Sequence, residues 1–563
     1  MDHTIPVWTT LRKRSKSVHV DAASPHPHLP VSRTIRSLWT TVRLPTTKRC
    51  RSPLHILFLI FNILDLFTQY HQRKYTMATS LQVFRRRWSS LISTSRNKLE
   101  PATQQPVPPP IQRLPSDLLA EIFTYCIPEM IDDDWRSCLV SNRSAPLLLC
   151  RVSSLWRSVA ISTPRLWHTF IFEKNVPHGH EKKLKSLSRG IRSWLGRSGT
   201  LPLTIRFLLH TNKDSLVTNA LKPLFEFSSR WDTILIDVSP HVRRWPTIKV
   251  LPNLRDFHGS ILRINEFPFA SAPNLKCLRA HSLTPNSTSI SKVPWSKLTE
   301  LTVTLEVPIT AALELFQSCP LLEKLSISVG SDDGGSSSPL PPLSVNSRIK
   351  LDALRWLWLY ITPASGVAVD YLTLPALEEL HLCGTSTISE PYCYSHVLNL
   401  LTRSRCQLRK QILMLSKFTP HQLLEYLKHP SCQTLVSLNV EESDDGSDGF
   451  VPVVGDEFLS QLMYSDEQDR APLCPKLADL SFKLCYRSEV DNPLGRMVQS
   501  RYFGRALDEQ LKSLDLFTRY PISPEDIKLL ELARDSGLKL SYASQPKEVY
   551  YSDWYDDDYY SGF

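Results

Sequence analysis

Pro320-Leu-Leu322-Glu-Lys-Leu325-Ser-Ile327 is one copy of a short pattern that recurs through the second half of the chain. The pattern is Pro-x-Leu-x-x-Leu-x-Φ, where Φ is an apolar residue. Its last two apolar positions are two residues apart, so they point to the same face of a short strand. The first leucine lies three positions earlier, and we expect it beneath the turn that leads into the strand. One copy cannot bury its own apolar face, so the pattern indicates copies that stack on one another.

Nine copies of this pattern lie between about residues 250 and 520, some without the proline. The first leucines of the first four copies are 21, 23 and 24 residues apart, which is within the 20–29 residues of a leucine-rich repeat. Later steps are longer, so some copies are missed or carry insertions. The first leucines are Leu254, Leu275, Leu298, Leu322, Leu354, Leu377, Leu435, Leu477 and Leu511.

The copies depart from a regular leucine-rich repeat. The asparagine or cysteine expected three positions after the strand is absent, and Gly330 and Thr385 stand in such positions. Arg405-Cys406-Gln407-Leu408 is a candidate for the start of a missed copy. We therefore predict an irregular α/β solenoid over about residues 200–545. An ordinary α/β domain with leucine-ended strands is the alternative.

The C-terminal part of the chain supplies an end for this array. Ser523-Pro524-Glu525-Asp526 is typical of a helix start and Gly537 of a helix stop, which predicts a capping helix. A last strand is expected over Leu538–Tyr542. Polar inserts between repeats and an acidic, aromatic tail over residues 546–563 have too few aliphatic residues to build a core.

Trp356 and Trp358 lie on one of the predicted strands. They alternate with Leu357 and Leu359, so both tryptophans occupy the face that points away from the core. Tryptophan is enriched where proteins bind one another, and we predict that these two side chains contact a target protein. The alternative is that they pack against a helix or a neighbouring insert.

A second informative stretch, Leu114 to Trp167, precedes the repeats. Pro115 suits a first helical position, and Leu118, Leu119, Ile122 and Phe123 recur with the spacing of one helix face. A second helix is predicted from Pro146, with Leu148, Val152, Leu155, Trp156 and Val159 on one side. So much apolar surface on a short helical unit favours docking onto another protein, and two amphipathic helices folded onto the rest of this chain are the alternative.

The residues of this stretch resemble the F-box, in particular that of fungal F-box proteins. The matching motifs are Leu-Pro-x-x-Leu-Leu-x-x-Ile-Phe from Leu114, Leu-x-x-Cys-Arg-Val-Ser-x-x-Trp-Arg-x-x-Ala from Leu147, and Thr-Pro-x-Leu-Trp from Thr163. The resemblance covers about residues 111–170, roughly a tenth of the chain. It implies a three-helix module that binds the Skp adaptor of Skp–cullin–F-box ubiquitin ligases. The interval between the first two motifs, Pro128–Ala145, is longer than in a compact F-box.

Carried over by position, the resemblance implies a set of adaptor-facing residues, and a connecting helix is expected over residues 171–200. The adaptor-facing residues would include Leu114, Pro115, Leu118, Ile122, Val152 and Trp156.

The net charge of +11 is unevenly distributed. Most of the excess of lysine and arginine lies in residues 1–110, and the rest of the chain is close to neutral. We expect residues 1–110 to be a basic, largely disordered leader that ends in a proline-rich linker. Met77 is a possible start of a shorter protein, so residues 1–76 are not required by the prediction. The apolar run Leu54–Phe67 is too short to span a bilayer.

The twelve cysteines are scattered singly, with no Cys-x-x-Cys pair, which favours reduced thiols in a cytoplasmic or nuclear protein. Glycine-rich phosphate loops, His-Glu-x-x-His and Gly-x-Ser-x-Gly are all absent from the sequence. We therefore expect no cofactor, no metal and no catalytic residue.

Together these features predict the substrate receptor of a Skp–cullin–F-box ubiquitin ligase. The F-box would bind the Skp adaptor and through it the cullin, while the repeats would bind an unknown protein target. The receptor would act by raising the local concentration of the target, without chemistry of its own. One alternative is an adaptor protein that uses its F-box without ubiquitin transfer. A weaker one is a nucleic-acid binder, which the near-neutral charge beyond the leader argues against. No membrane span is expected.

Overall fold

The computed structural model describes a large part of the chain after residue 113. The described residues are 114–127, 144–175, 186–211, 214–238, 246, 248, 250–259, 268–281, 293–331, 348–384, 392–414, 419–442, 452–464, 472–487, 492–503, 505 and 509–544. The expected leader, its apolar run and proline-rich linker, most of the interval 128–145, most of each polar insert and the tail 546–563 lie outside the described residues. No helix among the described residues is long and apolar enough to cross a membrane.

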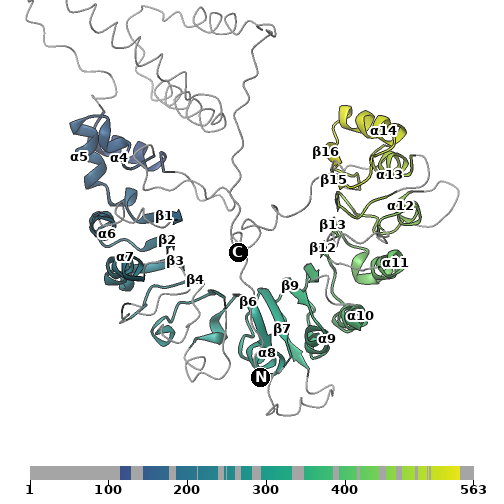
Figure 1. The fold of residues 1–563 in the computed structure, drawn as a ribbon, viewed down its shortest axis with the longest axis horizontal. Helices are drawn as coiled ribbons and strands as arrows, with labels where there is room; N and C mark the ends of the chain where they lie inside the picture. Colours follow the sequence, from purple (N-terminus) through teal and green to yellow (C-terminus); the bar gives the residue numbers. More distant parts are fainter. Residues whose placement is uncertain are drawn as a thin grey trace, which may run out of the picture. The chain divides into compact units, whose positions relative to one another are not determined.

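The described residues form a mixed α/β fold built on one long parallel sheet (Figure 1). Fourteen strands follow one another in the order in which they occur in the sequence, each paired with the next in parallel. The strands are β1 Thr169–Asn175, β2 Leu203–His210, β3 Trp231–Val238, β4 Asp256–Gly259, β5 Cys277–Ala280, β6 Glu300–Pro308, β7 Lys324–Gly330, β9 Trp356–Ile361, β11 Glu379–Gly384, β12 Lys410–Met414, β13 Ser437–Glu441, β14 Asp479–Lys483, β15 Ser513–Thr518 and β16 Lys539–Ser544. Two short strands, β8 Ile349–Lys350 and β10 Leu372–Thr373, pair separately.

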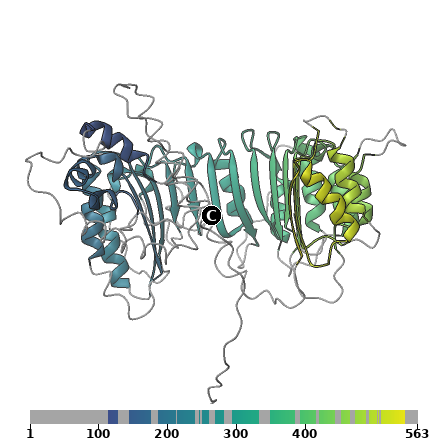
Figure 2. The same ribbon diagram turned by 90° about the horizontal axis from the view of Figure 1, so that it is seen from above.

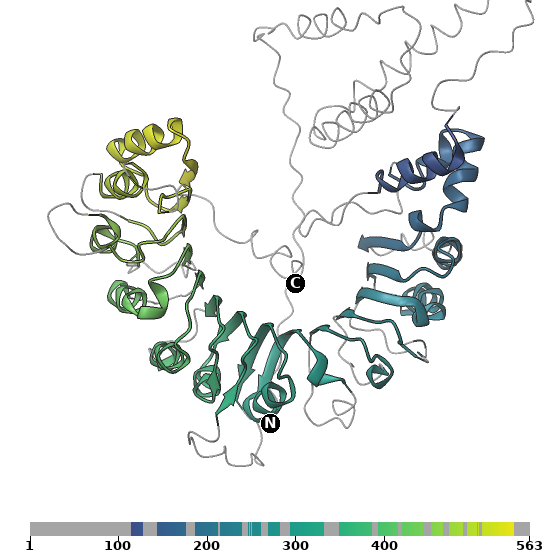
Figure 3. The ribbon, with the colours of Figure 1, turned by 180° about the vertical axis from the view of Figure 1, so that it is seen from behind.

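Helices connect most successive strands and lie on one side of the sheet, and no described helix covers its other side, which faces the inside of the arc that the strands follow (Figures 1 and 3). The α-helices are α4 Ser116–Thr124, α5 Ser154–Ser162, α6 Leu187–Arg197, α7 Asp214–Glu226, α8 Ile309–Ser318, α9 Pro363–Asp370, α10 Tyr392–Ser404, α11 Pro420–Lys428, α12 Asp456–Leu462, α13 Pro493–Tyr502 and α14 Pro524–Asp535. Short 3-10 helices η7 Phe269–Ser271 and η9 Trp295–Lys297 lie in connections without a described α-helix, whereas η5 Ser228–Arg230 and η11 Pro430–Cys432 follow α7 and α11.

The core is a set of apolar columns that run across the strands. In register, Leu325 of β7 pairs with Leu357 of β9, which pairs with Leu380 of β11, and all three are buried. The position two residues later repeats this arrangement with Ile327, Leu359 and Leu382. The first leucine of every predicted copy is also buried beneath its turn. Stacking therefore removes from water the apolar face that no single repeat could bury, the expected source of stability for such an array.

Nine predicted copies each supply a strand of this sheet, and the candidate copy at Leu408 supplies β12. The capping-helix prediction is matched by α14, where the Ser523 hydroxyl accepts a hydrogen bond from the Asp526 N–H. The last predicted strand is β16. The start of the array was placed too late, because the sheet begins at β1 and not near residue 200. Residues 171–200, expected to be a connecting helix, hold most of β1 as well as α6.

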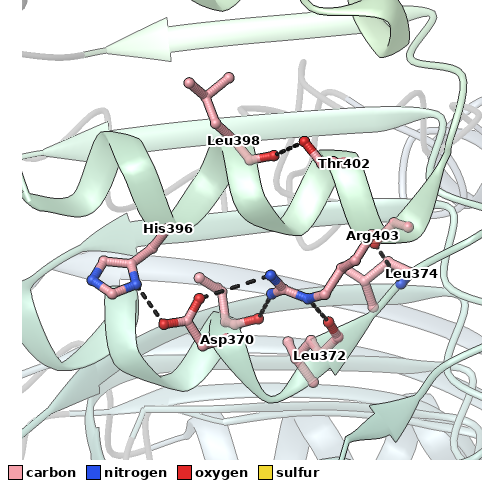
Figure 4. Close-up of polar contacts among 9 residues, drawn as sticks. Asp370, Leu372, Leu374, His396, Leu398, Thr402 and Arg403 are labelled. Carbon is pink, nitrogen blue, oxygen red and sulfur yellow. Dashed lines mark hydrogen bonds and ion pairs between the residues drawn. The ribbon is translucent and has the colours of Figure 1, made fainter. Parts of the chain in front are cut away.

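Arginines on the helical side tie neighbouring repeats together. Arg403 of α10 donates through Nε to the Leu372 carbonyl at 2.7 Å, and its Nη2 donates to the Val369 carbonyl at the end of α9. Figure 4 shows the guanidinium between the Leu372 carbonyl and Asp370. One Asp370 carboxylate oxygen lies 3.8 Å from Nη1 of Arg403, and the other lies 2.6 Å from Nδ1 of His396. The last carbonyls of a helix need donors from outside its regular hydrogen bonds. At the end of α9 the Val369 carbonyl accepts from the Tyr371 N–H, and the guanidinium of the next helix adds a charged donor.

The helical unit before the sheet differs from its prediction at one point. Instead of one helix from Pro146, residues 145–148 form turns, η2 covers Leu149–Arg151, and α5 begins at Ser154. The Ser153 side chain accepts a hydrogen bond from the Trp156 N–H and so caps α5. A capping serine favours the start of a new helix, although the apolar spacing of the sequence continues across Ser153. The first helix, α4, agrees with its prediction, with Pro115 at the capping position just before it.

Candidate protein-binding surfaces

The helical module, α4 with η2 and α5, has a small core of its own. Leu119 and Phe123 of α4 are buried, and Phe123 contacts the Trp156 ring at 4.9 Å between centroids. Trp156 is half-buried and Val159 is buried. The inward faces of α4 and α5 therefore pack on each other and stabilise the module.

The outward side of the same module is strongly apolar. Leu118 is 54% exposed, Val152 56% and Tyr125 69%. Leu155 and Ile161 of α5 are also exposed. Five of the eleven large apolar side chains that stand out as exposed in the described part of the chain thus lie between residues 118 and 161. Such a concentration on a unit of this size makes the module a candidate surface for binding another protein.

The predicted adaptor-facing residues divide into two groups. Pro115, Leu118 and Val152 are exposed, and Leu114, Ile122 and Trp156 are half-buried. Because Trp156 also packs on Phe123, it supports the module as well as lying at its surface. Tyr125 and Leu155 were missed as surface residues, although Leu118, Ile122 and Tyr125 have the i, i+4, i+7 spacing of one helix face.

Trp167 joins this module to the sheet. Its side chain is fully buried, and its indole N–H donates to the Ala160 carbonyl of α5 at 2.7 Å. Its ring meets Trp194 of α6 edge-on at 4.9 Å, and the Arg197 guanidinium lies 4.5 Å from the ring centroid. One side chain thus contacts the last helix of the module and the first helix of the array, so the two share one continuous core.

The second surface is the open face of the sheet, defined here by the strand residues that alternate with the buried columns. Figure 2 shows this run of parallel strands from another side. Trp356 and Trp358 lie on the open face of β9, as predicted, because they alternate with Leu357 and Leu359 of the buried columns. Whether these tryptophans bind a target stays a prediction.

Two further rings extend this pair into a cluster of four, which we call the aromatic cluster: Trp356, Trp358, Tyr360 and His381. Trp358 pairs in register with His381 of the next strand, β11. The His381 ring lies 5.2 Å from each tryptophan ring, and Tyr360 lies 6.3 Å from Trp358. Trp358 is only 9% exposed, so its contacts with neighbouring side chains already cover much of it. The predicted alternative, packing against neighbours, therefore accounts for part of its environment.

His381 was missed by sequence reasoning and is the most unusual member of the cluster. It is 5% exposed, and neither ring nitrogen makes a hydrogen bond with the described residues. The nearest charge is the Glu379 carboxylate, 3.7 Å from Nε2. Burial, with Lys410 as a smaller cause, lowers the pKa of His381 to about 4. The imidazole is therefore neutral at pH 7, with one nitrogen as donor and one as acceptor.

Charged side chains on the rest of the open face occur mainly as compensated pairs. Arg279 of β5 pairs with Glu300 of β6 at 2.5 Å, and Lys410 lies 3.8 Å from Glu379. Within the described part of this face, such compensated pairs do not favour a phosphate backbone, which binds uncompensated basic side chains.

Metal and thiol chemistry find little support in the described residues. Among them, no group of three His, Cys, Asp or Glu side chains is placed to hold a metal ion. Burial raises the pKa of the Cys406, Cys432 and Cys485 thiols, which keeps them protonated at neutral pH. Protonated thiols are poor nucleophiles.

The fold and these two surfaces define a parallel α/β array with an apolar helical module at its N-terminal end. No family model matches the chain. No curated protein matches it either.

Proposed function

We propose that the chain is the substrate-recognition subunit of a Skp–cullin–F-box ubiquitin ligase. Its helical module is the F-box that binds the Skp adaptor, and its parallel array is a degenerate leucine-rich-repeat domain, ended by α14, that binds a protein target. The proposal combines the F-box resemblance of the sequence with one structural observation. That observation is the exposed apolar surface around Leu118 and Val152 on a module with its own core.

The shared core at Trp167 supports a receptor role. A receptor must hold its target in a defined position relative to the adaptor, so that target lysines meet the ubiquitin-charged enzyme at high local concentration. A module fused to the array by buried aromatic contacts holds that position better than one joined by a loop.

The test is co-purification of the full chain with the Skp adaptor and cullin. The variant Leu118→Asp, Val152→Asp places two charges on the exposed apolar surface, and we expect loss of both partners with an unchanged unfolding temperature. Leu532→Asp on α14 is the matched control, because Leu532 is 52% exposed but lies at the other end of the array. Equal recovery of adaptor by the wild type and the double variant would contradict the proposal.

The same experiment separates ligase and non-ligase functions. Retention of the adaptor together with cullin supports the receptor role. Retention of the adaptor without cullin supports the alternative, an adaptor protein that uses the F-box without ubiquitin transfer.

A further inference from the structure

We infer that the aromatic cluster is a tyrosine-binding site, and that the tyrosine-rich C-terminal segment of this same chain, residues 546–563, occupies it. The docking itself is independent of the adaptor. Its consequence, competition between this segment and a target protein, rests on the proposed function.

The first argument is the chemistry of the cluster. Two indoles and a phenol offer flat apolar surfaces, and beside both indoles lies a buried imidazole that makes no hydrogen bond with the described residues. Burying an imidazole without hydrogen bonds is unfavourable, so a ligand that supplies one gains binding energy there. Trp356 and Tyr360 are half-buried on the open face of the sheet, so a ligand that approaches there meets these two rings first and His381 beside them.

Tyrosine meets both requirements of the cluster. Its ring stacks on indole and imidazole rings, and its hydroxyl donates to the acceptor nitrogen of a neutral imidazole. Phenylalanine supplies only the ring, and a charged side chain would need desolvation among the indoles. The cluster therefore favours a tyrosine over a phenylalanine or a charged side chain.

The C-terminal segment has this chemistry. Its last residues run Tyr550-Tyr-Ser-Asp-Trp-Tyr-Asp-Asp-Asp-Tyr-Tyr-Ser-Gly-Phe563, with five tyrosines and four aspartates and no lysine or arginine. On the open face, Trp356 of β9 pairs in register with Lys324 of β7 on one side and with Glu379 of β11 on the other. Glu379 pairs in turn with Lys410 of β12, two strands from Trp356. Lys324 borders the cluster, and Lys410, which also pairs with Glu379, lies beyond it; both suit a segment in which aspartates stand between tyrosines.

The segment is also long enough to reach. β16 ends at Ser544, six strand steps from β9 in the order of the sheet. At about 4.8 Å per step this separation is roughly 29 Å along the sheet. The chain from Ser544 to Phe563 spans up to about 60 Å when extended. Because the segment is tethered to the array, its effective concentration at the cluster is about millimolar, so a moderate affinity suffices for occupancy.

The test is a fluorescence-anisotropy titration of a labelled synthetic peptide of residues 546–563. The proteins are the full chain and a variant that ends at Gln545. We expect the shortened chain to bind the peptide at least tenfold more tightly than the full chain, because the attached segment competes with the peptide. Equal affinities for the two chains, or no binding to the shortened chain, would overturn the inference.

Variants of the shortened chain locate the site. His381→Phe keeps the ring and its burial but removes the nitrogens, and we expect three- to tenfold weaker peptide binding. Trp358→Ala should weaken binding at least tenfold, whereas Phe517→Ala, an open-face aromatic on β15, should leave it unchanged. Undiminished binding to both cluster variants would overturn the inference.

A second peptide tests the hydrogen bond. With all five tyrosines replaced by phenylalanine, the peptide should bind the shortened chain three- to tenfold more weakly than the natural peptide does. Against the His381→Phe variant of the shortened chain, the two peptides should bind with equal affinity. Additive losses would mean that the hydroxyl and the imidazole do not interact. Co-purification of the adaptor with the full chain is scored separately, so failure of the proposed function leaves the peptide result interpretable.

Discussion

The Tyr426 hydroxyl donates a hydrogen bond to Oε1 of Gln411 at 2.7 Å inside the core of the array. Both side chains are buried. Gln411 stands in the apolar column between Leu380 of β11 and Leu438 of β13, where the pattern calls for leucine. Tyr426 comes from α11, the helix that follows β12. A polar pair thus replaces an apolar contact between a strand and the helix of its own repeat.

Replacing Gln411 by leucine restores the apolar column but leaves the buried Tyr426 hydroxyl without this partner. We expect Gln411→Leu to lower the free energy of unfolding by about 1–3 kcal/mol. Adding Tyr426→Phe should recover most of that loss, because the unpartnered hydroxyl is then gone. Urea denaturation of the two single variants and the double variant measures the coupling, and additive effects would show that the pair acts independently.

Arg501 is the most buried of the arginines that join repeats. Its guanidinium donates to the carbonyls of Leu462, Leu473 and Cys474, and burial lowers the pKa of Arg501 to about 10. Arg501→Met should cost about 3 kcal/mol of unfolding free energy, because several buried carbonyls lose a charged donor together. Arg534→Met, which removes a half-exposed partner of Glu531, should cost less than about 1 kcal/mol. Thermal unfolding of both variants checks the contrast, and equal losses would contradict it.

The buried histidines predict a dependence of stability on pH. Burial lowers the pKa of both His381 and His258 to about 4, from an ordinary value of 6.5. Between these values the unfolded chain binds more protons than the folded one, so stability falls as the pH is lowered from about 6.5 to 4 and is fully present above 6.5. His381→Phe should flatten part of this slope in unfolding temperatures measured from pH 7 to 4.5. A slope unchanged by the substitution would contradict the assignment.

Trp167→Phe tests the junction between the module and the array. The substitution keeps an aromatic ring but removes the N–H that bonds the Ala160 carbonyl, which should lower the unfolding free energy by about 1–2 kcal/mol. If the two parts share one core, thermal unfolding stays a single transition in the wild type. Wild-type unfolding in two separate transitions would show that the module is independent of the array.

The repeat pattern predicted most strands of the sheet, because its apolar positions are the ones whose side chains must be buried. The pattern missed β1 and β3 because the position three residues before the core column, leucine elsewhere, holds Trp167 before Phe170 and Trp231 before Ile234, and it missed β2 because Pro202 stands three residues before Ile205. Both tryptophans are fully buried and occupy that position in place of leucine. A pattern written for leucine misses a larger residue that satisfies the same physical requirement.

Only part of the aromatic cluster could be predicted from the sequence. Alternation along one strand placed Trp356 and Trp358 on the open face, but His381 belongs to another strand. Aligning the copies would have found it, since Leu380-His381-Leu382 occupies the register of Leu357-Trp358-Leu359. Its burial depends on the ring packing of two neighbours, which no single-strand pattern contains.

Because the core is continuous at Trp167, the parallel sheet fixes the spacing between the helical module and the aromatic cluster. Seven strand steps separate β1 from β9, a path of about 34 Å along the sheet at the usual spacing. Gain or loss of one repeat would move the aromatic cluster by one step of about 4.8 Å relative to the module. Changes of loop length between strands would leave that path unaltered. The number of repeats therefore sets the path length from the module to the aromatic cluster, and evolution could change that length only by whole strand spacings.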